Sequence, residues 1–188
     1  MTAKKFRAII FDVCGVLVGG RERTRKVLEH TGTQEAMAKK FKLNIDSWID
    51  LIETPYNASM EGRMNGRRAV KKIAGRLGVT SKKLTEVWLS VYRKKVKKDK
   101  KLYKIAYSLK KNYIVGILSD QWYLSKKAFT PPENIKGFSP VIISCDVGFR
   151  KPDIRIYKLL MKKLREKNKA IKPGEVLFVD NRKYNLTP

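Results

Sequence analysis

Four short apolar segments alternate with longer amphipathic ones along the chain, and a polar residue lies at the end of each. The apolar segments are residues 6–18, 114–118, 141–145 and 176–179. Runs of this length, rich in Ile and Val, are typical of strands buried on both faces of a parallel sheet. Helical spacing returns over about 102–109 and 154–168. The pattern predicts a doubly wound α/β fold in which strands and helices alternate.

A long helical region separates the first apolar segment from the second. From about residue 21 to about residue 104, apolar residues recur every three or four positions, as on one face of an amphipathic helix. Within it, Thr54-Pro55 is expected to end one helix, Gly78 to end the next, and Ser81 to cap a third. The sequence therefore predicts a helical insertion after the first strand.

Asp12 lies where the first strand is expected to end. Gly15 and Gly19-Gly20 follow it and allow the backbone to turn sharply and approach a ligand. In open α/β sheets the ligand crevice lies outside the carboxyl ends of the strands. Asp12 can therefore face a binding crevice, or it can simply cap a turn, and this segment alone does not distinguish the two.

The chain is strongly basic, with 43 Lys and Arg against 17 Asp and Glu and a formal net charge of +26. Such a charge attracts polyanions or phosphorylated small molecules, although a solvated, lysine-rich surface needs no partner. Residues 93–101, flanked by Tyr92 and Tyr103, are the strongest candidate for contacting nucleic-acid phosphates. No nucleic-acid-binding motif accompanies them, and a solvated helix face is the simpler interpretation.

Other features exclude several classes of protein. Cys14 and Cys145 make neither a disulfide framework nor a zinc site. His30 is the only histidine, so a histidine-based triad would have no other base. The first residues lack a signal-peptide profile, and no apolar run approaches membrane-spanning length. These observations predict a cytoplasmic protein that has no membrane partner.

Four short motifs lie at the expected strand ends. They are residues 9–17 around Asp12, Ile117-Leu118-Ser119-Asp120, residues 148–157 around Lys151-Pro152, and residues 179–186 with Asp180-Asn181. In this order they resemble the signatures of the haloacid dehalogenase (HAD) superfamily of hydrolases, and the third is close to a branch that includes sugar-phosphate phosphatases. The resemblance spans nearly the whole chain. It implies a HAD-like Rossmannoid parallel sheet with helices on both faces.

The resemblance also implies a division into domains. Residues 1–18 and 105–188 would form the α/β core, and residues 19–104 a helical cap inserted after the first strand. The chain stops at Pro188, immediately after the fourth motif, whereas the family normally continues with a helix and a strand. Residues 176–179 would then form an edge strand with an uncovered apolar face. This predicts reduced stability, self-association through that edge, or a chain that is a fragment of a longer protein.

The same resemblance assigns chemical roles. Asp12 would be the nucleophile that attacks a phosphoryl group, and water would then hydrolyse the aspartyl-phosphate. Ser119, Asp120 and Lys151 would bind phosphate, with Lys151 also catalytic. Arg63, in an expected cap loop, could reach an anionic substrate. The implied cofactor is Mg²⁺, and its implied ligands are Asp12, the backbone carbonyl of Cys14, Asp180 and Asn181.

Two positions depart from the family pattern. Cys14 occupies the place of a second aspartate that serves as general acid/base, and a thiol with a pKa near about 8.5 is a poor proton donor there. Asn181 replaces an acid that normally binds the metal directly, and an amide contributes no charge. Both departures weaken the expectation of catalysis more than the expectation of the fold.

These observations favour a Mg²⁺-dependent phosphatase of a small phosphorylated metabolite. One alternative is a metal-independent dehalogenase, since such members of the family also lack the second aspartate. The other is a catalytically impaired HAD fold that binds nucleic acid or a protein through its basic surface.

Overall fold

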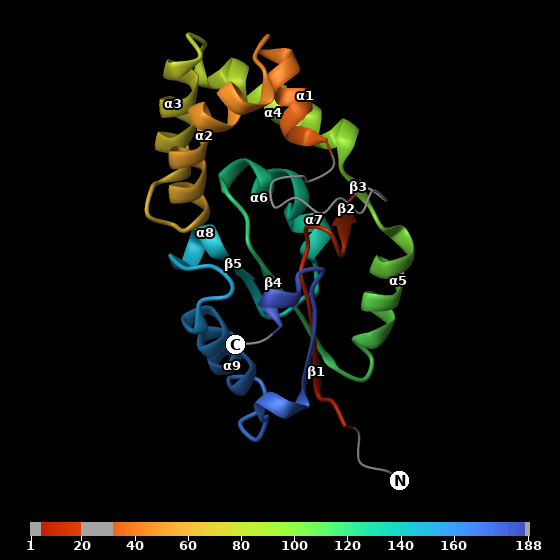
Figure 1. Ribbon diagram of the computed structural model, residues 1–188. Coiled ribbons are helices and arrows are strands. Elements are labelled where there is room, and N and C mark those ends of the chain that lie inside the picture. The colour runs from red at the N-terminus through yellow and green to blue at the C-terminus, as the bar shows by residue number, and fades with distance from the viewer. Residues whose placement is uncertain (1–4, 20–31, 187–188) are drawn as a thin grey trace.

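The structure, a computed structural model, describes residues 5–19 and 32–186, and a four-stranded parallel sheet forms its centre (Figure 1). In spatial order the strands are β5 (Val141–Ile143), β4 (Ile114–Ser119), β1 (Ala8–Phe11) and β6 (Val176–Val179). All three neighbouring pairs are parallel. The predicted α/β fold is therefore confirmed.

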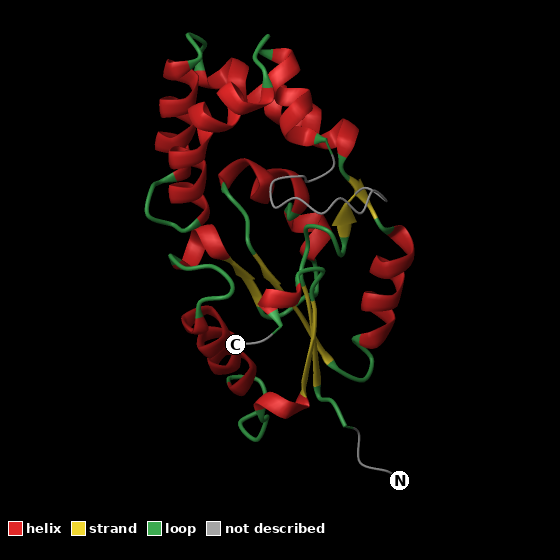
Figure 2. Ribbon diagram, in the orientation of Figure 1, coloured by secondary structure: helices red, strands yellow, loops and turns green. Residues whose placement is uncertain are grey.

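One group of helices flanks the sheet, and a second group forms a separate layer beyond the carboxyl ends of its strands (Figures 1 and 2). The flanking elements are α5 (Lys100–Leu109), α6 (Tyr123–Phe129), α7 (Pro132–Ile135), α8 (Ser144–Val147), α9 (Ile154–Arg165) and the 3-10 helices η1 (Pro173–Glu175) and η2 (Lys183–Asn185). The separate layer contains α1 (Thr33–Lys40), α2 (Ile45–Met60), α3 (Gly66–Arg76) and α4 (Ser81–Lys95). Within the described ranges, no helix is long and apolar enough to cross a membrane.

β1 lies inside the sheet, and all four of its residues are buried. Successive side chains of a strand point to opposite faces. Ala8 and Ile10 pack in a cluster with α9, whereas Ile9 and Phe11 pack in the cluster on the other face, which includes residues of α5. Burial on both faces explains why this segment is apolar without alternation.

The described residues of the predicted helical insertion include a short strand. β3 (Lys97–Lys98) pairs antiparallel with β2 (Val18–Gly19), a short strand that follows the turn after Asp12. The chain becomes helical again at Asp99, whose side chain accepts a hydrogen bond from the backbone N–H of Leu102 at 2.8 Å. Because this cap starts a new helix, α4 and α5 are separate elements. The assignment of residues 19–104 to a cap domain stays a prediction.

The expectation that Pro55 ends a helix is wrong. Pro55 lies inside α2, which continues to Met60. Proline has no N–H, so it cannot donate to the carbonyl of Leu51 four residues earlier. That carbonyl instead accepts a hydrogen bond from Nη1 of Arg76 at 2.5 Å, which replaces the missing helical bond. The N-cap expected at Ser81 is also displaced by one residue. Thr80 caps α4, and Ser81 is the first residue of that helix.

An aromatic cluster joins the helical layer to the end of the sheet. Trp88 of α4 is fully buried, and its ring centroid lies 5.3 Å from that of Trp48 of α2 and 4.5 Å from that of Trp122. Trp122, which follows β4, also donates a hydrogen bond from Nε1 to the hydroxyl of Tyr92 at 2.9 Å. One continuous hydrophobic cluster therefore holds α2 and α4 over the carboxyl ends of the strands.

β6 lies at one edge of the described sheet, as expected from the sequence. Its four residues are only partly buried, and Leu177 is 38% exposed. Val176 and Phe178 still pack against the cluster under α9. Self-association through this strand stays a prediction.

The aromatic cluster makes a testable contribution to stability. Replacing Trp88 with Ala should lower the free energy of unfolding by about 3–5 kcal/mol, because a fully buried aromatic side chain leaves a cavity among its neighbours. Urea denaturation followed by circular dichroism would measure the change. Ile105→Ala, at a position 44% exposed on α5, is the control and should change the same free energy by less than about 1 kcal/mol. A Trp88 effect as small as the control would contradict this account of the cluster.

Candidate active site

Three strands deliver acidic or hydroxyl side chains to one edge of the sheet. Asp12 follows β1, Ser119 and Asp120 lie at the end of β4, and Asp180 follows β6. The parallel register aligns the ends of these strands, since Phe11 pairs with both Ile117 and Val179. Lys151 enters from the loop between α8 and α9 and is buried, as are Asp12 and Ser119.

The ammonium of Lys151 lies between two of these carboxylates. Its Nζ is 2.6 Å from Oδ2 of Asp180 and 3.2 Å from Oδ1 of Asp12, and it donates a hydrogen bond to the carbonyl of Leu118 at 3.3 Å. Burial acts to lower the pKa of Lys151, but Asp12, Asp120 and Asp180 outweigh it and hold the pKa above its usual value. Lys151 is therefore a charged group that ties β1, β4 and β6 together.

Asp12 is a buried carboxylate, only 5% exposed. Burial raises the pKa of Asp12 above its usual value, and the negative charge of Asp180 acts in the same direction. Lys151 opposes this shift, and so does the neighbouring hydroxyl of Ser119. Oδ1 of Asp12 is fully buried and accepts no hydrogen bond from a described residue, although the Lys151 ammonium lies beside it.

The two remaining carboxylates have defined partners. Oδ2 of Asp180 accepts hydrogen bonds from Lys151 and, at 2.9 Å, from the side-chain amide of Asn185, while Oδ1 accepts one from the backbone N–H of Arg182 at 2.8 Å. Oδ1 of Asp120 accepts a hydrogen bond from the backbone N–H of Lys151 at 3.1 Å. Burial raises the pKa of Asp120 to about 6. The contact of Asp120 thus orients the Lys151 loop.

Cys14 and Asn181 lie beside the carboxylates. Gly15 has a φ of 85°, and a Cβ atom built on it would lie only 2.3 Å from Nδ2 of Asn181. Asn181 therefore packs directly against the backbone of the turn that follows Cys14. Burial and the charge of Asp12 raise the pKa of the Cys14 thiol well above its usual value. The thiol therefore stays protonated and adds no negative charge at this position.

A family model described as haloacid dehalogenase-like hydrolase matches residues 6–185, a range that includes all of these groups. The chain belongs to this family. The resemblance inferred from the four motifs is therefore confirmed.

Solved structures share the HAD-like fold at low sequence identity. A HAD family enzyme from Bacteroides thetaiotaomicron has a TM-score of 0.73 and is 20% identical, with 97% of this chain and 87% of that chain covered. The same enzyme in complex with magnesium and inorganic phosphate has a TM-score of 0.69 at 20% identity, covering 96% and 87%. An L-2-haloacid dehalogenase from Xanthobacter autotrophicus, solved with chloropropionic acid covalently bound, has a TM-score of 0.59 at 17% identity, covering 96% and 72%.

A curated relative matches over a small part of its length. Acyl-CoA dehydrogenase family member 10 of Mus musculus is 26% identical over 189 residues, which cover 97% of this HAD-like chain. The chain spans only 17% of the length of that relative.

Arg63 does not join the carboxylates of the HAD-like site. It is 64% exposed at its side chain and pairs with Glu61, with Nη2 2.5 Å from Oε2. Arg150, which the sequence reasoning missed, pairs with the same carboxylate, its Nε 3.4 Å from Oε1. A Cβ on Gly62 would lie 2.8 Å from Cα of Gly148, so this loop after α2 packs against the loop that carries Lys151. The sequence offered one indication of Arg150, namely that it directly precedes Lys151 in the third motif.

Asn185 and Tyr157 support the site from inside the third and fourth motifs. Asn185 holds Asp180, and its own carbonyl accepts a hydrogen bond from the hydroxyl of Tyr157 at 2.7 Å. Tyr157 lies in the third motif and Asn185 in the fourth, but their spacing in the sequence did not indicate a role.

Two further sequence candidates are His30 and the basic run 93–101. His30 falls outside the described residues. The basic residues of the run 93–101 are exposed at the end of α4, along β3 and at the start of α5, and nucleic-acid contact by this run stays a prediction.

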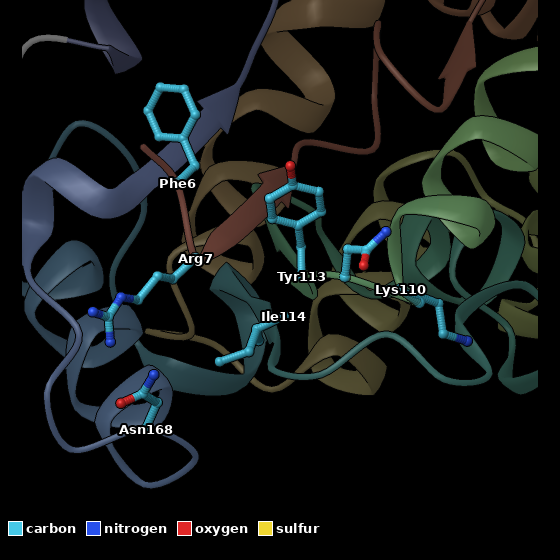
Figure 3. Close-up of a pocket in the computed structure, with 7 residues that line it drawn as sticks. Phe6, Arg7, Lys110, Tyr113, Ile114 and Asn168 are labelled. Atoms are coloured by element: carbon cyan, nitrogen blue, oxygen red, sulfur yellow. The ribbon is translucent and has the colours of Figure 1, made fainter. Parts of the chain in front are cut away.

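A surface cavity lies at the opposite end of the sheet (Figure 3). Its volume is about 520 Å³, and it is lined by Phe6, Arg7, Lys110, Asn112, Tyr113, Ile114 and Asn168. Arg7 and Lys110 point away from each other in it (Figure 3). The cavity lies at the amino-terminal ends of β1 and β4, whereas Asp12 lies at the carboxyl end of β1, so the two sites are separate. Within the described ranges, no group of three or more His, Cys, Asp or Glu residues could hold a metal ion by itself.

The buried ion pairs predict a large effect of removing Lys151. Lys151→Met should lower the free energy of unfolding at pH 7 by about 3–5 kcal/mol, because Asp12 and Asp180 would keep their buried charges without a partner. Urea denaturation with a chelator present would measure it. The matched control is Lys158→Met, at an exposed position of α9, which should stay within about 0.5 kcal/mol of the native protein. A change below about 1 kcal/mol for Lys151→Met would rule out this account.

The raised pKa of Asp120 predicts a pH dependence of stability. The folded state binds this proton more tightly than the unfolded state, so the contribution is present below about pH 4 and is lost as the pH rises to about 6. The loss should be roughly 2–3 kcal/mol, and Asp120→Asn should remove it while keeping an acceptor for Lys151. Denaturation from pH 4 to pH 7 with chelator would compare the slopes, with exposed Asp50→Asn as control. Equal slopes in all three proteins would refute the assignment.

Proposed function

We propose that this protein is a Mg²⁺-dependent phosphohydrolase that acts on a small phosphorylated metabolite, with Asp12 as its nucleophile. The observation that carries the proposal is the pairing of buried Asp12 with the Lys151 ammonium at the carboxyl ends of the strands. The relative solved with magnesium and inorganic phosphate supports the same class of reaction. The identification of a phosphorylated metabolite as the substrate is part of this proposal.

Asp12 performs the first step. Its carboxylate attacks phosphorus in line, the new O–P bond forms, and the bond from phosphorus to the leaving oxygen breaks. Water then attacks the aspartyl-phosphate, releasing inorganic phosphate and regenerating the carboxylate. This chemistry needs Asp12 ionised, and the positive charge of Lys151 counteracts the effect of burial on its pKa. The departing oxygen takes its proton from solvent, because the Cys14 thiol is a poor donor.

Ser119 and Lys151 bind the transferring phosphoryl group. Charge in such a transition state spreads over the equatorial oxygens, and prearranged donors stabilise it. The Lys151 ammonium is already oriented by the Leu118 carbonyl and Asp180, so it needs little reorganisation during the reaction. The Ser119 hydroxyl is fully buried next to Asp12 and supplies a neutral donor. Asp120 contributes through its hydrogen bond to the Lys151 backbone rather than by contact with phosphate.

The donors around Asp12 fit Mg²⁺. Three carboxylates share one buried ammonium, and Oδ1 of Asp12 has no hydrogen-bond donor among the described residues. Mg²⁺ binds oxygen donors and keeps several waters, so it needs few protein ligands. Asp12, the backbone carbonyl of Cys14 and the amide of Asn181 would hold it, because both oxygens of Asp180 already accept hydrogen bonds. When bound, the ion offsets the repulsion between Asp12 and the phosphate.

The metal-independent dehalogenase remains the alternative within the family. The L-2-haloacid dehalogenase relative, with a ligand covalently bound, and the absence of a second carboxylate at Cys14 favour it. The impaired fold that binds nucleic acid is favoured by the net charge of +26 and by Asn181. The three candidates differ in their dependence on Mg²⁺ and on Asp12.

Hydrolysis of an aryl phosphate tests the proposal, since its good leaving group does not need a general acid. We expect turnover with Mg²⁺, loss of turnover with chelator, and a fall of at least on the order of 10³-fold for Asp12→Asn. Asp50→Asn makes the same chemical change at an exposed position of α2 and should leave the rate unchanged.

Other outcomes favour the alternatives. Release of halide from a 2-haloacid with chelator present, without phosphate hydrolysis, would favour the dehalogenase. Neither activity, together with binding to generic RNA or DNA that weakens steeply with salt, would favour the impaired fold.

A further inference from the structure

We infer that Gln121 is a positioning residue that keeps the Ser119 hydroxyl oriented as a donor toward Asp12 and toward the phosphoryl group. The part that concerns phosphate rests on the proposed function. Gln121 lies two residues after Ser119, where the chain leaves β4, and is only 1% exposed. A buried amide is costly unless its donors and acceptor are bonded, so its partners show what it is oriented to do.

The backbone of Gln121 is anchored to the neighbouring strand. Its N–H donates a hydrogen bond to Oγ of Ser144 at 3.0 Å, and its carbonyl accepts one from the same hydroxyl at 3.3 Å. Ser144 directly follows β5 and is fully buried. The position of Gln121 is therefore determined by the sheet itself, not by a surface loop.

The side chain of Gln121 has a defined orientation. Its Oε1 accepts from the hydroxyl of Thr130 at 3.4 Å, and its Nε2 donates to Oγ of Ser119 at 3.2 Å. Thr130 follows α6 and is also buried. The Thr130 hydroxyl has a nearer acceptor in the carbonyl of Lys126 at 3.0 Å, so the contact that orients the NH₂ group is the one with Ser119.

This orientation determines which way the Ser119 hydroxyl points. A serine hydroxyl has a single hydrogen, whereas an amide NH₂ group can only donate. Since Oγ of Ser119 accepts from Gln121, its own hydrogen is left for another acceptor. The Asp12 carboxylate lies beside Ser119, and an ionised carboxylate can only accept. A phosphoryl oxygen is an acceptor of the same kind, so Ser119 meets it as a prearranged donor.

A double-mutant cycle tests this role with an aryl phosphate and Mg²⁺. Gln121→Met keeps the length of the side chain but removes its hydrogen bonds, and it should lower kcat/KM about 10-fold, less than the loss of a whole donor. Gln121→Glu should lower it further, because a carboxylate draws the Ser119 hydrogen toward itself. In a Ser119→Ala background, Gln121→Met should change kcat/KM less than about twofold, because the two residues act as one unit.

Gln34→Met is the matched control. Gln34 is the other buried glutamine of the described chain, and its Oε1 accepts a hydrogen bond from Nε1 of Trp48 at 2.7 Å. The substitution removes a buried amide from the helical layer and should lower thermal stability to an extent similar to Gln121→Met. It should leave kcat/KM unchanged.

Two results would overturn the inference. One is a Gln121→Met protein that loses stability like the control but keeps native kcat/KM and native affinity for inorganic phosphate. The other is an additive cycle with Ser119→Ala, which would mean that Gln121 acts independently of Ser119.

Phosphate affinity, measured by calorimetry, separates this inference from the proposed function. If the native protein binds inorganic phosphate but turns over no aryl phosphate, the proposed function fails. Weaker phosphate binding in Gln121→Met, but not in the Ser119→Ala background, would then still support the inference. A native protein that neither turns over nor binds phosphate overturns both.

Discussion

The buried ammonium of Lys151 is the interaction on which the rest of this site depends. Asp12, Asp120 and Asp180 come from three different strand ends, and mutual repulsion would separate them if no cation lay between them. Lys151 bonds to two of these carboxylates directly and to the third through its backbone. The same ammonium counteracts the effect of burial on the pKa of Asp12, and in the proposed reaction it would donate to the anionic substrate.

Buried polar groups and an aromatic cluster surround these charges. A chain of buried hydroxyl and amide groups runs from Ser144 through Gln121 to Ser119, so the donor beside Asp12 is anchored to the adjacent strand. On the open side, α2 and α4 lie over the strand ends, held by Trp88 and Trp122. Excluding water strengthens every electrostatic interaction inside such a site.

Several departures from the sequence-based expectation have one kind of cause, which is a contact with a residue distant in sequence. Pro55 stays within a helix because Arg76, on another helix, bonds to the carbonyl that proline leaves free. The short pairing of β2 with β3 interrupts the helical insertion. None of these contacts leaves a periodic or local signal in the sequence.

The sequence by itself determined the order of the strands along the chain, their parallel arrangement and the presence of Asp12, Ser119 and Asp180 at the same edge. It could do so because burial on both faces of a sheet requires continuous apolar segments, and because parallel strands end together. Only the tertiary structure decided how the charges pair, since the pairing depends on side-chain directions and on the orientation of a buried amide. The anchoring of Ser119 is the clearest case, because Gln121, which donates to its hydroxyl oxygen, is itself held by Ser144 after the neighbouring strand.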